Sequence, residues 1–192
     1  MRRLVIVAVS AVLASSAAAE EHRELGAHQH GHGTFNLAIE GSHVSMELEA
    51  PGADIVGFEH PAQTPEQKAA VEKATTTLAS PLSVFKVPEA AGCRIVATSV
   101  RLEADEEHED KAAKSEAKSD AKPETKAAEH SDFHAEYGLE CTNTKAISSI
   151  VFDYFRAFPG AQELDVTVVT DKGQNKFEVT RANPRIDIGG LM

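Results

Sequence analysis

The residues with the clearest chemical potential are histidines at regular spacing near the start of the chain. His28, His30 and His32 alternate with glutamine and glycine. Imidazole nitrogen is a good ligand for Zn²⁺, which accepts four ligands with tetrahedral geometry. In an extended chain, residues two apart lie on one side at a separation of about 6.5 Å, so neighbouring histidines can converge on one ion. The spacing indicates a metal site, although loose surface histidines also bind metal weakly and incidentally.

Histidines further along the chain can supply more ligands. They are His43, His60, His130 and His134. Any one of them alone is typical of an ordinary surface histidine, but together with the first cluster they weaken that interpretation. Nickel, cobalt and copper can use the same imidazoles, because the general order of affinity favours copper. We therefore predict a histidine site for a divalent metal, with Zn²⁺ as the expected ion.

Residues 1–19 are typical of a secretory signal peptide. Arg2 and Arg3 precede an apolar run over residues 4–13, and small residues end at Ala19, where we expect cleavage. An uncleaved anchor would need about 20 apolar residues to span a bilayer, and this run is shorter. No later stretch is apolar enough for membrane insertion. We expect a soluble protein of the bacterial periplasm.

In an exported protein, the two cysteines are expected to form a disulfide. An oxidising compartment favours disulfides, and an even count leaves no thiol over. We expect Cys93 to pair with Cys141. A metal site built on these thiols is the competing hypothesis, but the pair lacks CxxC spacing.

The net charge restricts the partners. A formal charge of -11 at pH 7 disfavours binding to nucleic acid or to an anionic membrane surface. It suits an exported protein that collects cations.

Two strands are expected to carry the histidine cluster into the fold. Residues 20–33 are polar and glycine-punctuated, which predicts a flexible histidine-rich lead. Apolar and polar residues then alternate over 34–40 and 43–49, and Gly41 with Ser42 supplies a hairpin turn between them. The alternation directs His43 and Glu47 away from the core.

A helix and two further strands follow. Thr64, Pro65 and Gln67 form an expected capping box, with helical spacing continuing to Leu78. Residues 94–102 predict a strand, with Val96, Thr98, Val100 and Leu102 on one face. Residues 133–141 predict another, with Phe133, Ala135, Tyr137, Leu139 and Cys141 on one face and His134, Glu136 and Glu140 on the other.

A charged segment separates those two strands. Residues 103–129 consist almost entirely of Ala, Glu, Asp, Lys and Ser, so the segment cannot bury enough surface to offset its ordering entropy. We expect a disordered insertion, with a solvated single helix as the alternative because these residues are good helix formers.

The last third completes the expected domain. Residues 147–158 are apolar and can form a strand, a short helix or both. Residues 164–170 and 177–181 flank a hairpin signal at 171–174, and residues 186–188 are extended. Together these strands and the helix predict a single α+β domain over residues 34–192, with a mostly antiparallel sheet, one well-marked helix and one covered sheet face.

Several motifs resemble a known family in matching order along the chain. They are HGHG (30–33), FNLAIEG (35–41), APGADIVGFEH (50–60), Cys93, HAEYGLEC (134–141), FRAFPG (155–160) and Gln174. In these motifs, which cover nearly all of the mature chain, the sequence resembles periplasmic zinc-regulated, zinc-binding proteins of the ZrgA type.

The resemblance implies zinc binding, expression under zinc limitation, and support of a zinc-importing ABC transporter and its solute-binding protein. It also implies that His30, His32, His43 and His60 are site residues. One feature departs from the relatives: their central insertion is dense in His, Asp and Glu, whereas here it carries only His108 and His130 at its margins. Zinc should therefore be held by the first cluster and the folded domain, in a site that the flexible lead closes.

Three function classes compete. The leading hypothesis is a non-catalytic protein that captures or buffers Zn²⁺ and supports its uptake. A zinc-dependent hydrolase would use Glu47 or Glu59 as general base, but the chain has no HExxH or GxSxG motif and no phosphate-binding glycine loop. The third is an adaptor that docks onto a transporter or onto its own copy under the control of metal.

Overall fold

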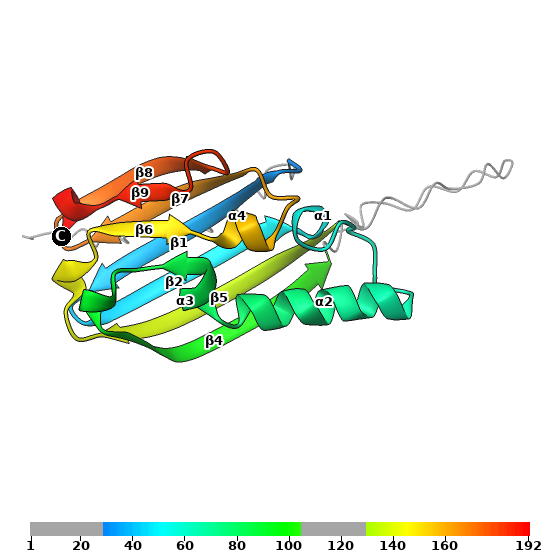
Figure 1. Ribbon diagram of the computed structural model, residues 1–192, viewed down its shortest axis with the longest axis horizontal. Helices are drawn as coiled ribbons and strands as arrows, with labels where there is room; N and C mark the ends of the chain where they lie inside the picture. Colours follow the sequence, from blue (N-terminus) through cyan, green and yellow to red (C-terminus); the bar gives the residue numbers. More distant parts are fainter. Residues whose placement is uncertain (1–28, 105–129) are drawn as a thin grey trace, which may run out of the picture.

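The computed structural model describes residues 29–104 and 130–192 (Figure 1). The expected signal peptide, most of the expected lead including His28, and most of the expected insertion lie outside the described residues. The largest element is a six-stranded sheet in the order β4-β5-β2-β1-β7-β8. Its strands are β1 (His32–Glu40), β2 (His43–Pro51), β4 (Cys93–Ala104), β5 (Ser131–Cys141), β7 (Glu163–Thr170) and β8 (Gly173–Thr180).

The alternation of the sequence sets the two faces of this sheet. Phe35, Leu37 and Ile39 of β1 are buried, and the predicted apolar face of β5 is buried with them. We call the face that these side chains share the inner face, and the opposite one the outer face. The predicted hairpin pairs β1 with β2, with Glu40 opposite His43. The sheet is mixed rather than purely antiparallel, because β1 pairs with β7 in parallel.

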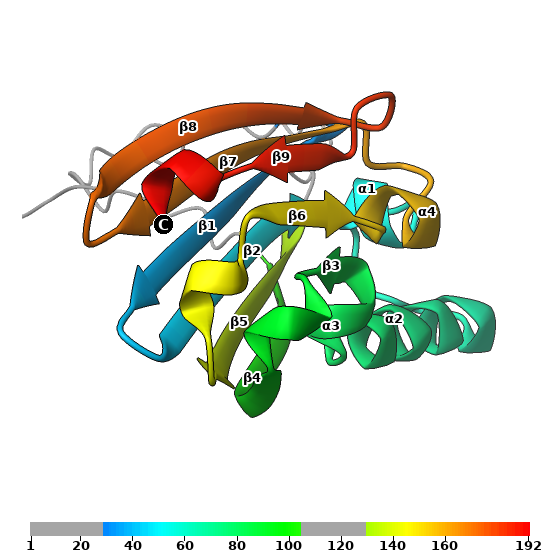
Figure 2. The same cartoon turned by 60° about the vertical axis from the view of Figure 1, so that its left-hand side comes forward.

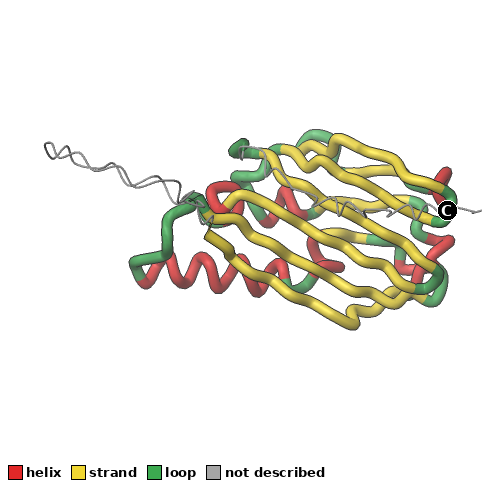
Figure 3. Tube along the Cα trace, turned by 180° about the vertical axis from the view of Figure 1, so that it is seen from behind, coloured by secondary structure: helices red, strands yellow, loops and turns green. Residues whose placement is uncertain are grey.

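Short elements cover the inner face, as Figure 2 shows. A three-stranded sheet has the order β3-β6-β9. Its strands are β3 (Phe85–Lys86), β6 (Ser149–Phe152) and β9 (Arg185–Asp187), and the helices are α1 (Gly52–Ile55), α2 (Pro65–Leu78), α3 (Pro81–Val84) and α4 (Tyr154–Ala157). Single 3₁₀ turns occupy Glu89–Ala91, Thr144–Ala146 and Gly189–Leu191. Figure 3 shows the molecule from behind: among the described residues, neither the small sheet nor a helix covers the outer face.

An aromatic cluster joins the two layers. Phe85 lies between Phe35 of the large sheet, at 4.4 Å between ring centroids, and Tyr154 of α4, at 5.9 Å. Phe152 packs edge-on against Phe35 at 5.5 Å. Such pairs add to the free energy gained from burial, so this cluster holds the small sheet against the large one.

Several predicted elements are confirmed. α2 begins after Thr64, whose side chain accepts a hydrogen bond from the Gln67 amide, and the reciprocal bond completes the capping box. It is the one helix of more than six residues in the described ranges. The ambiguous segment 147–158 forms both a strand, β6, and a short helix, α4.

Other boundaries and one face differ from the prediction. β1 begins at His32, inside the expected lead, and β4 continues through Glu103 and Ala104, inside the expected insertion. The prediction that Val96 shares a face with Val100 is wrong, because the register of β4 on β5 shifts between Ile95 and Ala97. This bulge leaves the Val96 side chain exposed.

The predicted cysteine pair is confirmed. Cys93 and Cys141 form a disulfide between the start of β4 and the end of β5, where they are direct partners in the strand register. No helix in residues 29–104 and 130–192 is both long and apolar enough to cross a membrane.

Candidate metal centre

Two histidines and a glutamate meet at one end of the large sheet. His30 Nε2 lies 2.8 Å from Glu59 Oε1, and His130 Nδ1 lies 2.5 Å from Glu59 Oε2. One ligand atom from each residue falls within 4.8 Å of the other two. The side chains of His30 and His130 are 64% and 47% exposed, whereas that of Glu59 is 12% exposed. We call these three residues the first group.

The local backbone brings the first group together. Gly31 adopts φ +87°, a left-handed conformation that glycine accepts without strain. The turn it makes separates His30, which faces Glu59, from His32, which lies on β1. Glu59 belongs to the loop after α1, and this loop is fixed to β5 because the Ser131 hydroxyl donates to the Glu59 carbonyl at 2.7 Å. That bond places His130, the residue before Ser131, beside the Glu59 carboxylate.

A buried carboxylate, Asp54 of α1, lies behind the first group. Its Oδ1 accepts a hydrogen bond from the Gly31 amide at 2.8 Å, while Oδ2 has no hydrogen-bond partner among the described residues. Burial raises the pKa of the Asp54 carboxyl, and the Gly31 amide and the neighbouring His30 oppose that shift. A carboxylate kept in a buried position next to imidazoles favours positive charge at the group.

The loop after α4 closes the back of Asp54. A Cβ on Gly160 would lie 2.5 Å from the Asp54 carbonyl oxygen, so a side chain cannot fit there. Arg181 fixes this loop by donating to the carbonyls of Phe155 at 2.6 Å and Phe158 at 3.0 Å. Three motifs that carry the family resemblance, residues 30–33, 50–60 and 155–160, therefore meet around Asp54.

His32 and His60 lie near the first group but have other partners. His32 Nδ1 is 3.5 Å from Glu163 Oε1, its neighbour across the β1–β7 pair. His60 stacks on Phe58, its Nδ1 lies 3.0 Å from the Pro61 carbonyl, and its Nε2 lies 3.3 Å from the side-chain Nε2 of Gln67 at the start of α2. Both ring nitrogens of His60 thus have partners, one within the loop and one on α2.

His43 lies at the opposite end of β2. Its Nδ1 is 3.8 Å from Glu140, which also pairs with Arg94. The structure thus does not bring His43 to the first group, and a role in metal binding would require a different site. His28 lies outside the described residues.

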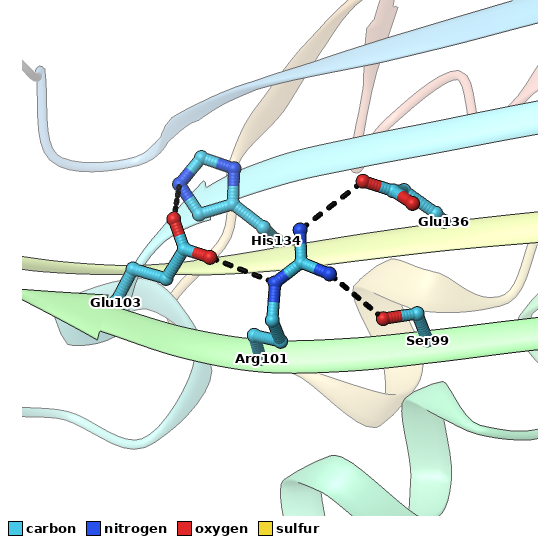
Figure 4. Close-up of polar contacts among 5 residues, drawn as sticks. All are labelled: Ser99, Arg101, Glu103, His134 and Glu136. Atoms are coloured by element: carbon cyan, nitrogen blue, oxygen red, sulfur yellow. Dashed lines mark hydrogen bonds and ion pairs between the residues drawn. The ribbon is translucent and has the colours of Figure 1, made fainter.

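A second set of ligand atoms lies further along the outer face. Glu49 of β2 and Asp132 and His134 of β5 each place one ligand atom within 4.8 Å of the others. We call these residues the second group. Figure 4 shows His134 and Glu136 of β5 with their neighbours on β4. The His134 Nε2 lies 3.9 Å from Glu103. Arg101 donates hydrogen bonds to Glu103, Ser99 and Glu136. Hydrogen bonding to Arg101 lowers the pKa of the Glu103 carboxyl, so this carboxylate stays ionised.

A hollow among the described residues is separate from both groups. It is a groove of about 650 Å³ in the middle of the outer face, where small residues such as Ala38, Ser45 and Gly138 leave space between longer side chains. Its lining includes Glu47 and Glu136 but no histidine. The first group instead lies at the end of the sheet with its imidazoles open to solvent, and the second group is partly buried.

The donor set of the first group suits zinc. Two imidazole nitrogens and one carboxylate oxygen are common zinc ligands, and three protein ligands leave the fourth tetrahedral position for water or a further residue. The histidine pattern of the sequence named His30 and His130, but Glu59 was expected only as a general base and Asp54 was missed. The signal for Glu59 was its position directly before His60; Asp54 carries no local signal, because its burial depends on the Gly160 loop.

Comparison with known proteins agrees with this donor chemistry. No protein of curated function matches the chain. Residues 27–188, which include both groups and the disulfide, match a family of zinc uptake proteins. The chain belongs to the ZrgA family of zinc uptake proteins.

Proposed function

We propose that this protein is a non-catalytic zinc-binding protein of the periplasm, which captures or buffers Zn²⁺ and supports its uptake by a zinc ABC importer. The first group carries the proposal: His30, Glu59 and His130 offer a zinc donor set, contributed by three separate segments of a zinc uptake family member. In this role zinc is cargo, so the site must release the ion as well as bind it.

The exposure of the first group supports exchange of zinc with another protein. Both imidazoles are about half exposed or more, while the carboxylate between them is mostly covered. A partner protein can therefore approach the imidazole side of a bound ion directly. A hydrolase would instead be expected to hold its zinc at the base of a pocket that positions a substrate, and the group lies on the rim of the sheet.

The expected signal peptide and the disulfide support the proposed location. Residues 1–19 have the composition of a cleavable secretory signal. Disulfides persist in oxidising compartments such as the bacterial periplasm, and Cys93 is bonded to Cys141. The periplasm is also where a zinc importer collects its substrate from a solute-binding protein.

Calorimetric titration of residues 20–192 with Zn²⁺ tests the proposal. We expect the double variant His30→Gln, His130→Gln, and separately Glu59→Gln, to weaken the tightest site by about tenfold or more, because the first removes two ligands of the first group and the second removes one. His43→Gln is the matched control, since it removes an exposed histidine at the far end of β2 and should change the affinity by less than about twofold.

Two results would contradict the proposal. One is a wild-type affinity weaker than about 100 μM; the other is an unchanged affinity in both first-group variants. A zinc-induced shift in mass, measured by size-exclusion elution with and without zinc, would instead favour the metal-controlled adaptor. A strain lacking the chain should accumulate less zinc under zinc limitation, and the wild-type chain, but not the double variant, should restore it.

A further inference from the structure

The second group has the chemistry of a metal site but no assigned role. Glu49, Asp132 and His134 contribute two carboxylates and one imidazole, all on the outer face. They come from two adjacent strands and not from loops. Their positions are therefore fixed by the hydrogen-bonded ladder of β2 and β5.

The strand register explains why these side chains meet. Glu49 is the direct partner of His134. Asp132 lies two residues before His134 on the same face of β5 and is opposite Pro51. Directly opposed side chains on antiparallel strands have Cβ atoms about 4.5–5.5 Å apart. Pro51 has no polar side chain, and on the other side of β5 Asp132 is opposite Glu103 of β4.

Burial gives the second group a protected side. Asp132 is 2% exposed, and the His134 side chain is 27% exposed. Carboxylates in such an environment hold a cation more strongly than fully solvated ones, because the local dielectric constant is lower. The arrangement is thus unlike a patch of surface acids, which lie in water.

The arginine nearest to the second group has other partners. Arg101 is opposite His134 on β4, but its guanidinium is committed to Glu103, Ser99 and Glu136 (Figure 4). Within the described ranges, no lysine or arginine forms an ion pair with Glu49. Two carboxylates within 4.8 Å of one another repel when both are ionised. A divalent cation between them would remove that repulsion.

We propose that Glu49, Asp132 and His134 form a second divalent-cation site, next to the first group. His130 and Asp132 are two residues apart, a separation of about 6.6 Å along an extended chain, so the two ions would be neighbours. Carboxylate ligands suit harder ions than imidazoles do; the second site therefore binds Zn²⁺ more weakly than the first and accepts Mn²⁺ comparatively well. The inference rests on the proposed function only for the choice of Zn²⁺ as the natural ion.

Native mass spectrometry of residues 20–192 with Zn²⁺ counts the ions and tests this inference. Glu49→Gln keeps the shape of the side chain and removes its charge. Glu47→Gln is the matched control, because Glu47 points outward two residues earlier on the same strand. We expect Glu49→Gln to lose one bound Zn²⁺ relative to its parent, in the wild-type chain and in the His30→Gln, His130→Gln background. Glu47→Gln should lose none.

A titration with Mn²⁺ separates this inference from the proposed function. Glu49→Gln should weaken Mn²⁺ binding by about tenfold, and the first-group double variant should change it little. An equal number of bound Zn²⁺ ions in the Glu49→Gln, Glu47→Gln and parent chains would overturn the second site. Loss of an ion in Glu49→Gln but not in the first-group variant would support it and contradict the proposed function. If Glu49→Gln fails to fold by circular dichroism, His134→Gln, at a partly exposed position, takes its place with the same expected loss.

Discussion

At the scale of single residues, Glu59 is the centre of the first group. Its two carboxylate oxygens face different imidazoles, His30 at 2.8 Å and His130 at 2.5 Å. The carboxylate thus holds His30 and His130 close together, so an ion bound by the first group would require little rearrangement of these side chains.

Asp54 is a buried carboxylate whose charge has a cost in stability. Burial raises its pKa, which means that the folded state favours the protonated carboxyl and that the ionised form destabilises the fold at neutral pH. Asp54→Asn keeps an acceptor for the Gly31 amide and removes the buried charge. We expect the free energy of unfolding of the zinc-free protein to rise by roughly 1 kcal/mol at neutral pH in urea denaturation.

The same substitution should weaken zinc binding by a few-fold, because the negative charge behind His30 is lost. The effect of Asp54→Asn on the free energy of unfolding should depend on pH. The gain in stability should be present at neutral pH and shrink as the pH falls through the raised pKa of Asp54, since wild-type Asp54 then becomes neutral too. A less stable Asp54→Asn protein at neutral pH would show that the carboxylate is stabilising and contradict this account.

Sequence patterns pointed to the histidines of the candidate site more readily than to its carboxylates. Nine histidines in 192 residues stand out, and the spacing of His28, His30 and His32 drew attention to one segment. The chain has 30 Asp and Glu residues, so no single acid stands out in the same way. Glu59 and Asp54 become recognisable only when the chain brings residues 31, 59, 130 and 160 to one end of the sheet.

At the scale of secondary-structure elements, local signals were sufficient where the structure depends on local interactions. The capping box at Thr64 predicted the start of α2, and alternation predicted the faces of β1, β2 and β5. The parallel pairing of β1 with β7 joins residues more than a hundred positions apart, and no short pattern encodes it. The bulge at Val96 was missed for a related reason, since it appears only in the register against β5.

The disulfide stabilises the pair of strands on either side of the charged segment. Cys93 and Cys141 are separated by 48 positions, and a crosslink over such a loop is worth about 2–4 kcal/mol. We expect Cys93→Ala, Cys141→Ala to lower the free energy of unfolding by that amount in urea denaturation. Because Cys141 ends β5 and His130 precedes its first residue, zinc affinity at the first group should change by less than about threefold.

Reduction of the wild-type protein provides a control for that variant. The reduced wild type and the double variant should unfold at similar urea concentrations, since both lack the same crosslink. Equal stability of the oxidised wild type and the variant would show that the bond contributes nothing to the fold. A large loss of zinc affinity in a variant that stays folded would show that β4 and β5 transmit strain along their length.

At the scale of the whole molecule, charge and architecture act together. The net charge of -11 attracts cations over the entire surface. The inner face is covered, so the exposed histidines and carboxylates gather on the outer face and at the end of the sheet where β1 and β5 begin. A diffuse attraction for cations is not specific, and specificity for zinc must come from the imidazoles.

Thermal unfolding with and without Zn²⁺ distinguishes specific binding from diffuse attraction. A ligand at about 100 times its Kd stabilises the folded state by about 2.7 kcal/mol, which corresponds to a rise in Tm of roughly 5–10 °C for a domain of this size. Protons compete with zinc for imidazole nitrogen, so the rise should be large near about pH 7.5 and small near about pH 5.5. The triple variant His30→Gln, Glu59→Gln, His130→Gln should lose most of the rise at the higher pH.

Mg²⁺ at equal concentration measures the diffuse contribution, because it binds imidazole poorly. An equal rise in Tm with Mg²⁺, or a rise with Zn²⁺ that does not depend on pH, would mean that charge alone attracts the metal.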